Sequence, residues 1–287
     1  MIASALLAAV IGMHDTLGGE QAEGWARVSR LCDTQPQLWS GDFGYSHIPN
    51  DDIRLRGRLF EKAARLGAQG VQITLSWHQC NPTVDEPCTF KNGVQKPLSD
   101  EEWRALLTDG SALNRRWRRQ EDRLASYLEK LQKRGVTVLL RPYHEANIPG
   151  FWWASDDAAR SVELWRQLHR HFTEKRGLHN LRWVWSVSLH PRYWARVGDY
   201  YPGDAWVDVV GVDAYPPTKE GQPDYALAWN TLRSIAPTKP LVLSEVSRLP
   251  TAQELRARPW GYVVPWGMNM LLRDNSVSHI CRAYTRP

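Results

Sequence analysis

The chain has 287 residues and a net charge of +5, with 43% hydrophobic and 23% charged residues. This composition is typical of a globular protein and excludes a chain that is disordered throughout. The length suits one α/β barrel, which takes roughly 250 residues, and no apolar run approaches the roughly 20 residues that cross a bilayer.

Eight apolar runs, several of them rich in β-branched residues, recur along the chain and predict buried strands. They cover residues 9–14, 37–42, 71–78, 137–145, 181–186, 207–215, 240–245 and 261–266. Between them, helical periodicity covers residues 54–66, 114–134, 158–176 and 225–235, with a shorter segment near 20–32. Strands that alternate with helices imply a parallel sheet with helices outside, and eight such strands predict a single (β/α)8 TIM barrel, an α/β fold.

The two ends of the chain depart from a regular barrel. Residues 1–12 are apolar but lack a positively charged start, so they make a poor signal peptide. Only residues 251–258 separate the last two predicted strands, and residues 271–287 show no long helical pattern. We therefore expect a reduced or missing final helix, within one domain that spans residues 1–287.

Tryptophan is the unusual component, at 15 residues. Indole rings suit a bulky core or a surface that stacks on flat rings, which makes sugars and bases candidate ligands. The basic run at 115–119 would suit a polyanion, whose binding would weaken steeply with salt. Because Glu121 and Asp122 follow this run on a helical pattern, a solvated helix face is the better interpretation, and we expect no nucleic-acid partner.

Four cysteines are present, and no Cys-x-x-Cys pair suggests a zinc site. Cys80 and Cys88 bracket a short loop, which predicts a disulfide if the compartment is oxidising. The alternative is four unrelated buried thiols.

Polar and aromatic residues follow nearly every predicted strand. In a parallel barrel the carboxyl ends of the strands converge on one face, which carries the active site. These residues are His14, Asp15, Asp42, Tyr45, Trp77, His78, His144, Glu145, Asp213, Tyr215, Glu245 and Trp266.

The fourth predicted strand carries Arg141, His144 and Glu145 at its end. A zinc-protease helix would need a second His four residues after His144, where Ile148 stands, so we expect no metal there. A structural ion pair remains an alternative. Glu145 and Glu245 close two apolar strands, and paired carboxylates are what glycosidic cleavage needs.

The motifs of other enzyme classes are missing. The sequence contains no nucleophile elbow, no phosphate-binding P-loop and no dinucleotide fingerprint, so we expect no cofactor.

Several stretches resemble glycoside hydrolase family 26, a β-mannanase family among the retaining (β/α)8 glycosidases. The similar stretches are 41–45, 76–78, 81–82, 141–145, 151–153, 201–204, 207–215 and 239–245, in the order of the family. The resemblance implies that Glu145 is the acid/base and Glu245 the nucleophile. The substrate-binding residues that we expect are Asp42, Trp77, His78, Arg141, His144, Trp152, Trp153, Tyr215 and Trp266, with Trp152 and Trp153 as walls that stack on sugars.

The resemblance further implies a retaining mechanism, with the two carboxyl groups roughly 5–5.5 Å apart rather than about 6.5–9.5 Å. The expected substrate is β-1,4-mannan or another mannose-containing polysaccharide or oligosaccharide. Alternatives are β-1,3-xylan, mixed-linkage glucan, or a barrel that binds carbohydrate without catalysis. We expect a secreted or periplasmic monomer without a membrane partner.

The sequence departs from the family after Glu145. The family commonly has Met-Asn-Gly there, whereas this chain has Ala-Asn-Ile-Pro-Gly at 146–150, which leaves substrate preference open. A barrel also places its first helix near its tail, so we expect Cys32 and Cys281 to form a second disulfide.

Overall fold

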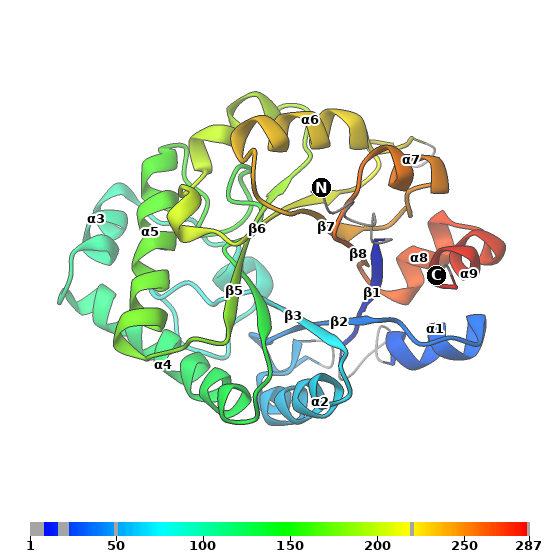
Figure 1. Cartoon of the computed structure of the whole chain (residues 1–287). Helices are drawn as coiled ribbons and strands as arrows, with labels where there is room; N and C mark the ends of the chain where they lie inside the picture. The colour runs from blue at the N-terminus through cyan, green and yellow to red at the C-terminus, as the bar shows by residue number, and fades with distance from the viewer. Residues whose placement is uncertain (1–8, 17–22, 49–50, 219–220, 286–287) are drawn as a thin grey trace, which may run out of the picture.

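The computed structural model describes residues 9–16, 23–48, 51–218 and 221–285. Its centre is a closed barrel of eight parallel strands that neighbour one another in chain order (Figure 1). The strands are β1 (Val10–His14), β2 (Leu38–Asp42), β3 (Gln72–Trp77), β4 (Val138–Pro142), β5 (Leu181–Ser188), β6 (Val209–Ala214), β7 (Leu241–Val246) and β8 (Tyr262–Pro265). The predicted (β/α)8 barrel is confirmed.

Five amphipathic helices surround the barrel, and each overlaps a segment with predicted helical periodicity. They are α1 (Gly24–Cys32), α2 (Arg56–Ala68), α4 (Ala112–Lys133), α5 (Ala158–Arg170) and α6 (Tyr225–Ile235). Helix α4 begins where the Ser111 hydroxyl accepts from the Asn114 N–H at 3.0 Å. It ends before Gly135, whose φ of 70° suits glycine.

Shorter elements complete the outer layer. They are α3 (Asp100–Leu107), α7 (Ala252–Ala257), α8 (Met268–Asp274), α9 (Val277–Tyr284), the 3-10 helices η2 (Ile53–Leu55), η5 (Trp194–Tyr200) and η6 (Asp204–Trp206), and the π-helical turns η3 (Phe90–Val94) and η4 (His171–Lys175). Helix α3 was not predicted, although Ser99 and Glu102 form a capping box at its start.

The barrel ends in two short helices, α8 and α9, of seven and eight residues. A reduced final helix is thus confirmed, and it is divided rather than missing. Helix α9 lies beside α1 (Figure 1), where the predicted disulfide joins Cys32 to Cys281. The Tyr284 hydroxyl also donates to the Gly12 carbonyl of β1 at 2.7 Å. The end of the chain therefore closes against its first strand and helix.

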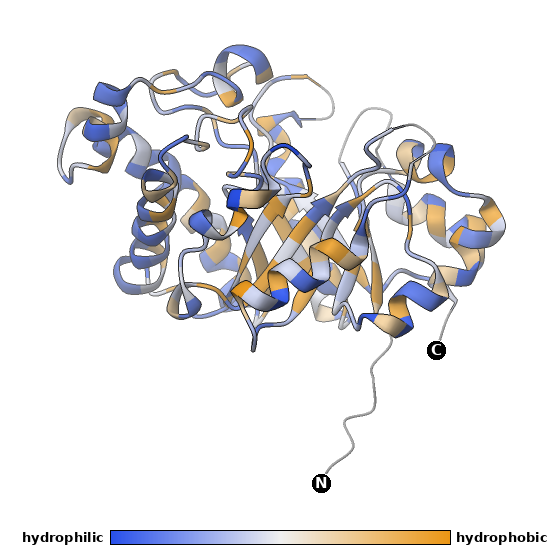
Figure 2. Cartoon of the chain, turned by 90° about the horizontal axis from the view of Figure 1, so that it is seen from above, coloured by the Kyte–Doolittle hydropathy of each residue, from blue (hydrophilic) through white to orange (hydrophobic). Residues whose placement is uncertain are grey.

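Apolar side chains fill the barrel and the layer between strands and helices. One buried cluster joins Leu38, Val184, Val209, Val242, Tyr262 and Val264, all on strands. A larger cluster packs strands against helices, and Figure 2 shows hydrophobic residues along the strands with hydrophilic ones on the helices outside. Among the helices of the described residues, none is long and apolar enough to cross a membrane. The predicted poor signal peptide lies mostly in residues 1–8, outside the described residues.

Candidate active site

The loop that follows β4 carries Glu145 on an unusual backbone. Tyr143 and Glu145 have φ angles of 46° and 56°, in the left-handed region that residues with side chains rarely adopt. The Glu145 N–H donates to the Ser186 carbonyl of β5 at 2.9 Å, which ties the turn to the neighbouring strand. Such backbone conformations persist only where surrounding contacts enforce them, and they gather at functional sites.

Glu245, near the end of β7, is 5% exposed and held at both oxygens. Arg141 donates to its Oε1, and the Tyr215 hydroxyl donates to its Oε2 at 2.6 Å. Arg141 also donates to Asp213 Oδ2 at 2.9 Å, and the Ser186 hydroxyl donates to Asp213 Oδ1 at 2.8 Å. The guanidinium thus bridges two carboxyl groups and fixes the orientation of Glu245.

Glu145 has a different environment from Glu245. Burial, and then the charge of Glu245, raise the pKa of Glu145 to about 7. A carboxyl with such a pKa keeps its proton close to neutral pH and can release it to a substrate. Two carboxyl groups in distinct environments, one bonded to Arg141 and Tyr215 and one that keeps its proton close to neutral pH, are the arrangement that acid-assisted cleavage requires.

A chain of hydrogen bonds runs from Asp42 through His78 to His144. Asp42 Oδ2 bonds His78 Nδ1 at 2.8 Å and the Ser76 hydroxyl at 2.7 Å, while its Oδ1 accepts from the Gly44 N–H at 3.1 Å. His78 Nε2 lies 3.2 Å from His144 Nε2. Asp42 thus bonds the His78 nitrogen that does not face His144, and it fixes the orientation of the His78 ring.

The two histidines in this chain of hydrogen bonds, His78 and His144, differ in protonation. Burial alone would lower the pKa of His78, but the adjacent Asp42 carboxylate raises it above its usual value. Burial and the charge of Arg141 hold the pKa of His144 well below its usual value. Neutral His144 therefore accepts the hydrogen that His78 donates from Nε2.

Trp266 follows β8 and covers the floor of the site. Its half-buried ring stacks on His14 with centroids 3.7 Å apart and planes at 14°, and the Arg141 guanidinium lies 5.7 Å from the Trp266 ring centroid. His14, noted at the end of the first predicted strand, was not among the expected substrate-binding residues. The structure places it directly beneath Trp266.

The prediction that Trp152 and Trp153 form walls of a sugar cleft is wrong. Both side chains are fully buried, and so is Trp77 at 1% exposure. The Trp152 indole N–H donates to the Gln79 carbonyl at 2.8 Å, and that of Trp153 donates to the His144 carbonyl at 2.7 Å. A ring without an exposed face cannot stack on a sugar. These three residues support the site from within the core.

Two phenylalanines offer the exposed rings instead. Phe151 stacks on Trp153 with centroids 4.5 Å apart and planes at 9°, and its ring lies 5.6 Å from that of His78. Phe90 is 37% exposed and lies 6.2 Å from Phe151, edge to face. The sequence analysis chose neither residue, although Phe151 directly precedes the tryptophan pair that it did choose.

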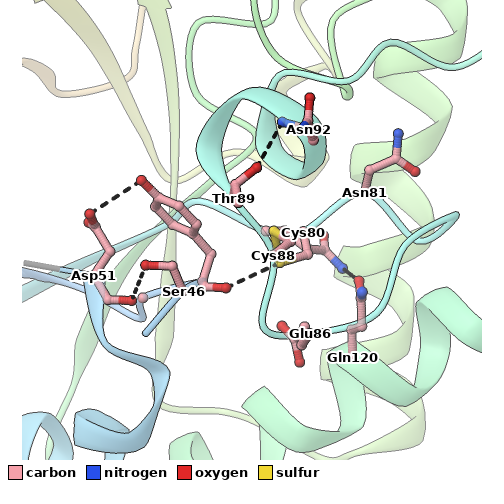
Figure 3. Close-up of a disulfide and its surroundings, with 12 residues drawn as sticks. Ser46, Asp51, Cys80, Asn81, Glu86, Cys88, Thr89, Asn92 and Gln120 are labelled. Carbon is pink, nitrogen blue, oxygen red and sulfur yellow. Dashed lines mark hydrogen bonds between the residues drawn. A yellow bond between two sulfur atoms is a disulfide. The ribbon is translucent and has the colours of Figure 1, made fainter. Parts of the chain in front are cut away.

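The loop that carries Phe90 is held by the predicted disulfide between Cys80 and Cys88 (Figure 3). The Cys88 N–H also donates to the Tyr45 carbonyl at 2.7 Å, which joins this loop to the one after β2. Gly93 is needed beside the disulfide, because a Cβ there would lie 2.2 Å from Cys88 Sγ. With both disulfides present, the alternative of four unrelated thiols is excluded.

A cavity of about 620 Å³ adjoins the loop that carries Glu145. Its lining includes Ile148 and Gly150, from the segment that departs from the family pattern, together with Phe151, Arg192 and Tyr193. A second cavity, of about 400 Å³, lies beside Tyr215 and Arg273. Within the described ranges, no group of three or more His, Cys, Asp or Glu side chains is arranged to hold a metal ion.

Comparison with known proteins found similar curated sequences and solved structures. Mannan endo-1,4-beta-mannosidase A and B of Caldalkalibacillus mannanilyticus is 34% identical over 62% of this chain and 34% of its own length. Mannan endo-1,4-beta-mannosidase of Bacillus subtilis (strain 168) is 31% identical over 70% of this chain and 56% of its own length. The chain thus spans between a third and somewhat over half of these curated relatives.

Among solved structures, GH26A from a Muricauda species has a TM-score of 0.87 and 29% identity, over 97% of this chain and 90% of that one. The sequence model of Glycosyl hydrolase family 26 matches residues 17–248. With that match across most of the barrel, the chain belongs to glycoside hydrolase family 26.

Proposed function

We propose that this chain is a retaining endo-β-mannanase that hydrolyses internal β-1,4 bonds of mannan or a related mannose-containing polysaccharide. The observation that carries the proposal is the pair of carboxyl groups in two different environments. The pKa of Glu145 is raised to about 7, and Glu245 is held by Arg141 and Tyr215. The names of the curated relatives, mannan endo-1,4-beta-mannosidases, support the substrate.

In the first step, a Glu245 oxygen attacks the anomeric carbon while Glu145 gives its proton to the leaving oxygen. The glycosidic bond breaks, and the sugar becomes an ester of Glu245. In the second step, Glu145, now ionised, takes a proton from water, which displaces Glu245 and restores both carboxyl groups. The mechanism requires carboxyl groups roughly 5–5.5 Å apart, which remains a prediction.

Endo action is supported by two cavities that lie beside the ends of different strands. One cavity lies beside the loops after β4 and β5, and the other lies beside the ends of β6 and β7. Because Glu145 protonates the leaving oxygen, the cavity next to its loop is suited to the departing part of the polysaccharide. Phe90 and Phe151 offer apolar ring faces near the cleavage point.

Two disulfides support an oxidising compartment, so we propose a secreted or periplasmic protein that acts as a monomer on its polysaccharide.

Another β-glycan is the second candidate substrate, because the 146–150 loop that shapes the cavity departs from the family pattern. Reducing-sugar release from mannan, galactomannan, glucomannan, xylan and mixed-linkage glucan tests both. We expect release from the mannans by wild type and strongly reduced release by Glu145→Gln. Equal turnover by the two proteins would refute the role of Glu145. Release of sugar only from xylan or mixed-linkage glucan would identify that β-glycan as the substrate instead of mannan.

A barrel that binds without catalysis predicts a different result. Glu245→Ala would then leave affinity for the glycan unchanged, and wild type would release no sugar. We expect Glu245→Ala to abolish release.

A further inference from the structure

Helix α4 contacts two loops of the site from outside the barrel. Trp117 and Gln120, one turn apart on its buried face, each bond a residue next to one of the site histidines. The Trp117 indole N–H donates to the Tyr143 hydroxyl at 3.0 Å, and Tyr143 directly precedes His144. The side-chain oxygen of Gln120 accepts from the side-chain amide of Gln79 at 2.7 Å, and Gln79 directly follows His78.

On the same face lies Glu121, a fully buried acid that the proposed mechanism does not use. Its Oε2 accepts from Arg118 Nη1 at 2.7 Å, and Arg118 also donates to the Gln167 side chain of α5 at 3.1 Å. Its Oε1 is buried and has no hydrogen-bond partner among the described residues. A buried oxygen without a partner is costly and calls for a donor.

Tyr143 is the complementary group. Its hydroxyl accepts a hydrogen bond from Trp117, so its own hydrogen is still available. Trp117, which bonds Tyr143, lies four residues before Glu121 on α4, so Glu121 is on the same buried face of the helix. Burial, and then the charge of Glu121, raise the pKa of Tyr143 well above its usual value. Tyr143 is only 3% exposed, so bulk water does not compete for the bond.

We propose that Glu121 is a positioning residue for the acid/base: a hydrogen-bonded water between its Oε1 and the Tyr143 hydroxyl fixes the turn that aims Glu145. Tyr143 and Glu145 both have left-handed backbone, so the turn depends on contacts that enforce it. Tyr143 supplies such contacts through Trp117, through its edge-to-face packing on Trp152 and through Glu121.

The bond does not depend on the charge state of Glu121. Burial raises the pKa of Glu121 to about 8 against the lowering effect of Arg118, so the carboxyl exchanges its proton within the neutral to alkaline range. When ionised, Glu121 accepts a hydrogen bond from the bridging water; when protonated, it donates one to that water. Arg118, Asp122 and Tyr143 are the charged or titratable groups that act on it or face it.

The inference rests on the proposed function and is tested with two substrates that differ in their need for an acid. Mannan has a poor leaving group and requires the Glu145 proton. A dinitrophenyl β-mannoside releases a stable phenolate without one, and its initial burst reports the first step alone. Loss of a residue that aims Glu145 therefore lowers the rate of mannan hydrolysis and leaves the burst rate with the dinitrophenyl β-mannoside unchanged.

We expect Tyr143→Phe and Glu121→Leu each to lower kcat on mannan about tenfold with an unchanged KM, as for loss of one buried hydrogen bond. The burst rate should stay within about twofold of wild type. Glu121→Gln, which keeps the shape and a hydrogen-bonding group, should retain most activity. The double variant Glu121→Leu/Tyr143→Phe should be no worse than the poorer single variant, because both remove one bond.

Matched controls are Tyr127→Phe on the same helix and Glu163→Leu, which breaks the half-exposed pair with Arg170. Both variants should leave kcat on mannan and the burst rate unchanged. Equal losses on mannan and in the burst, or additive losses in the double variant, would overturn the inference. If Glu121→Leu does not fold, Tyr143→Phe, which loses only one hydroxyl, still tests the inference through the same comparison of kcat on mannan with the burst rate. A wild type that cleaves neither substrate would refute the proposed function instead.

Discussion

Replacing Arg141 by methionine removes the cation that two buried carboxylates share. Arg141 is 3% exposed, and it donates to Asp213 at 2.9 Å and to Glu245. Methionine keeps an unbranched stem, so the loss is mainly electrostatic. Removing one partner of a buried ion pair costs roughly 3–5 kcal/mol, because the remaining charge is left buried and unpaired.

This loss can be measured as a shift of Tm. An unfolding entropy of about 2.1 cal/mol/K per residue gives roughly 0.6 kcal/mol/K for 287 residues. We therefore expect Arg141→Met to lower Tm by roughly 5–8 °C in calorimetry at neutral pH, and to abolish turnover. The control is Arg134→Met, which breaks an exposed pair with Glu61 and should leave Tm unchanged. If Arg141→Met melts within about 2 °C of that control, the inner ion pairs do not stabilise the barrel as argued.

Two further predictions concern the carboxyl pair and the exposed rings. Burial raises the pKa of Glu145 from 4.5 to about 7, so its ionised form destabilises the folded state; the penalty is absent below about pH 4.5 and complete above about pH 7. Glu145→Gln should therefore raise the free energy of unfolding at pH 8, by at most about 3 kcal/mol, and not at pH 4; urea titrations that show equal effects at both would contradict the assignment. In wild type, kcat/KM should fall as the pH rises through about 7. Phe151→Ala should raise KM for mannan about tenfold with little change in kcat, as for loss of one stacking surface. Leu227→Ala, at an exposed position on α6, is the control, and an unchanged KM for Phe151→Ala would exclude Phe151 from the cleft.

The barrel and the polar strand ends were predictable because both follow from local pattern. Apolar runs followed by Trp77 and His78, or by Glu245, mark a strand and the face where it ends, and parallel strands bring such ends together. The capping box at Ser99 was an available signal for α3 that the sequence analysis did not use.

The orientation of loop side chains was not predictable. Phe151, Trp152 and Trp153 are adjacent and chemically similar, yet only Phe151 keeps an exposed face. The difference arises because each indole N–H meets a backbone carbonyl inside the fold, from Gln79 or from His144. Those carbonyls come from other turns of the chain, so no linear pattern reveals them. The same holds for Phe90, whose position depends on the Cys80 to Cys88 disulfide.

The disulfide between α1 and α9 encloses 249 positions of sequence, so the described barrel is nearly a covalent ring. A barrel opens most easily where its first and last elements meet, since that seam has no chain continuity across it. Here the seam is crosslinked, and α9 cannot peel away from α1 while the bond is intact. Local fraying at the ends, the usual entry point for proteases, is thereby suppressed, which favours a long lifetime of the folded state where proteases are present.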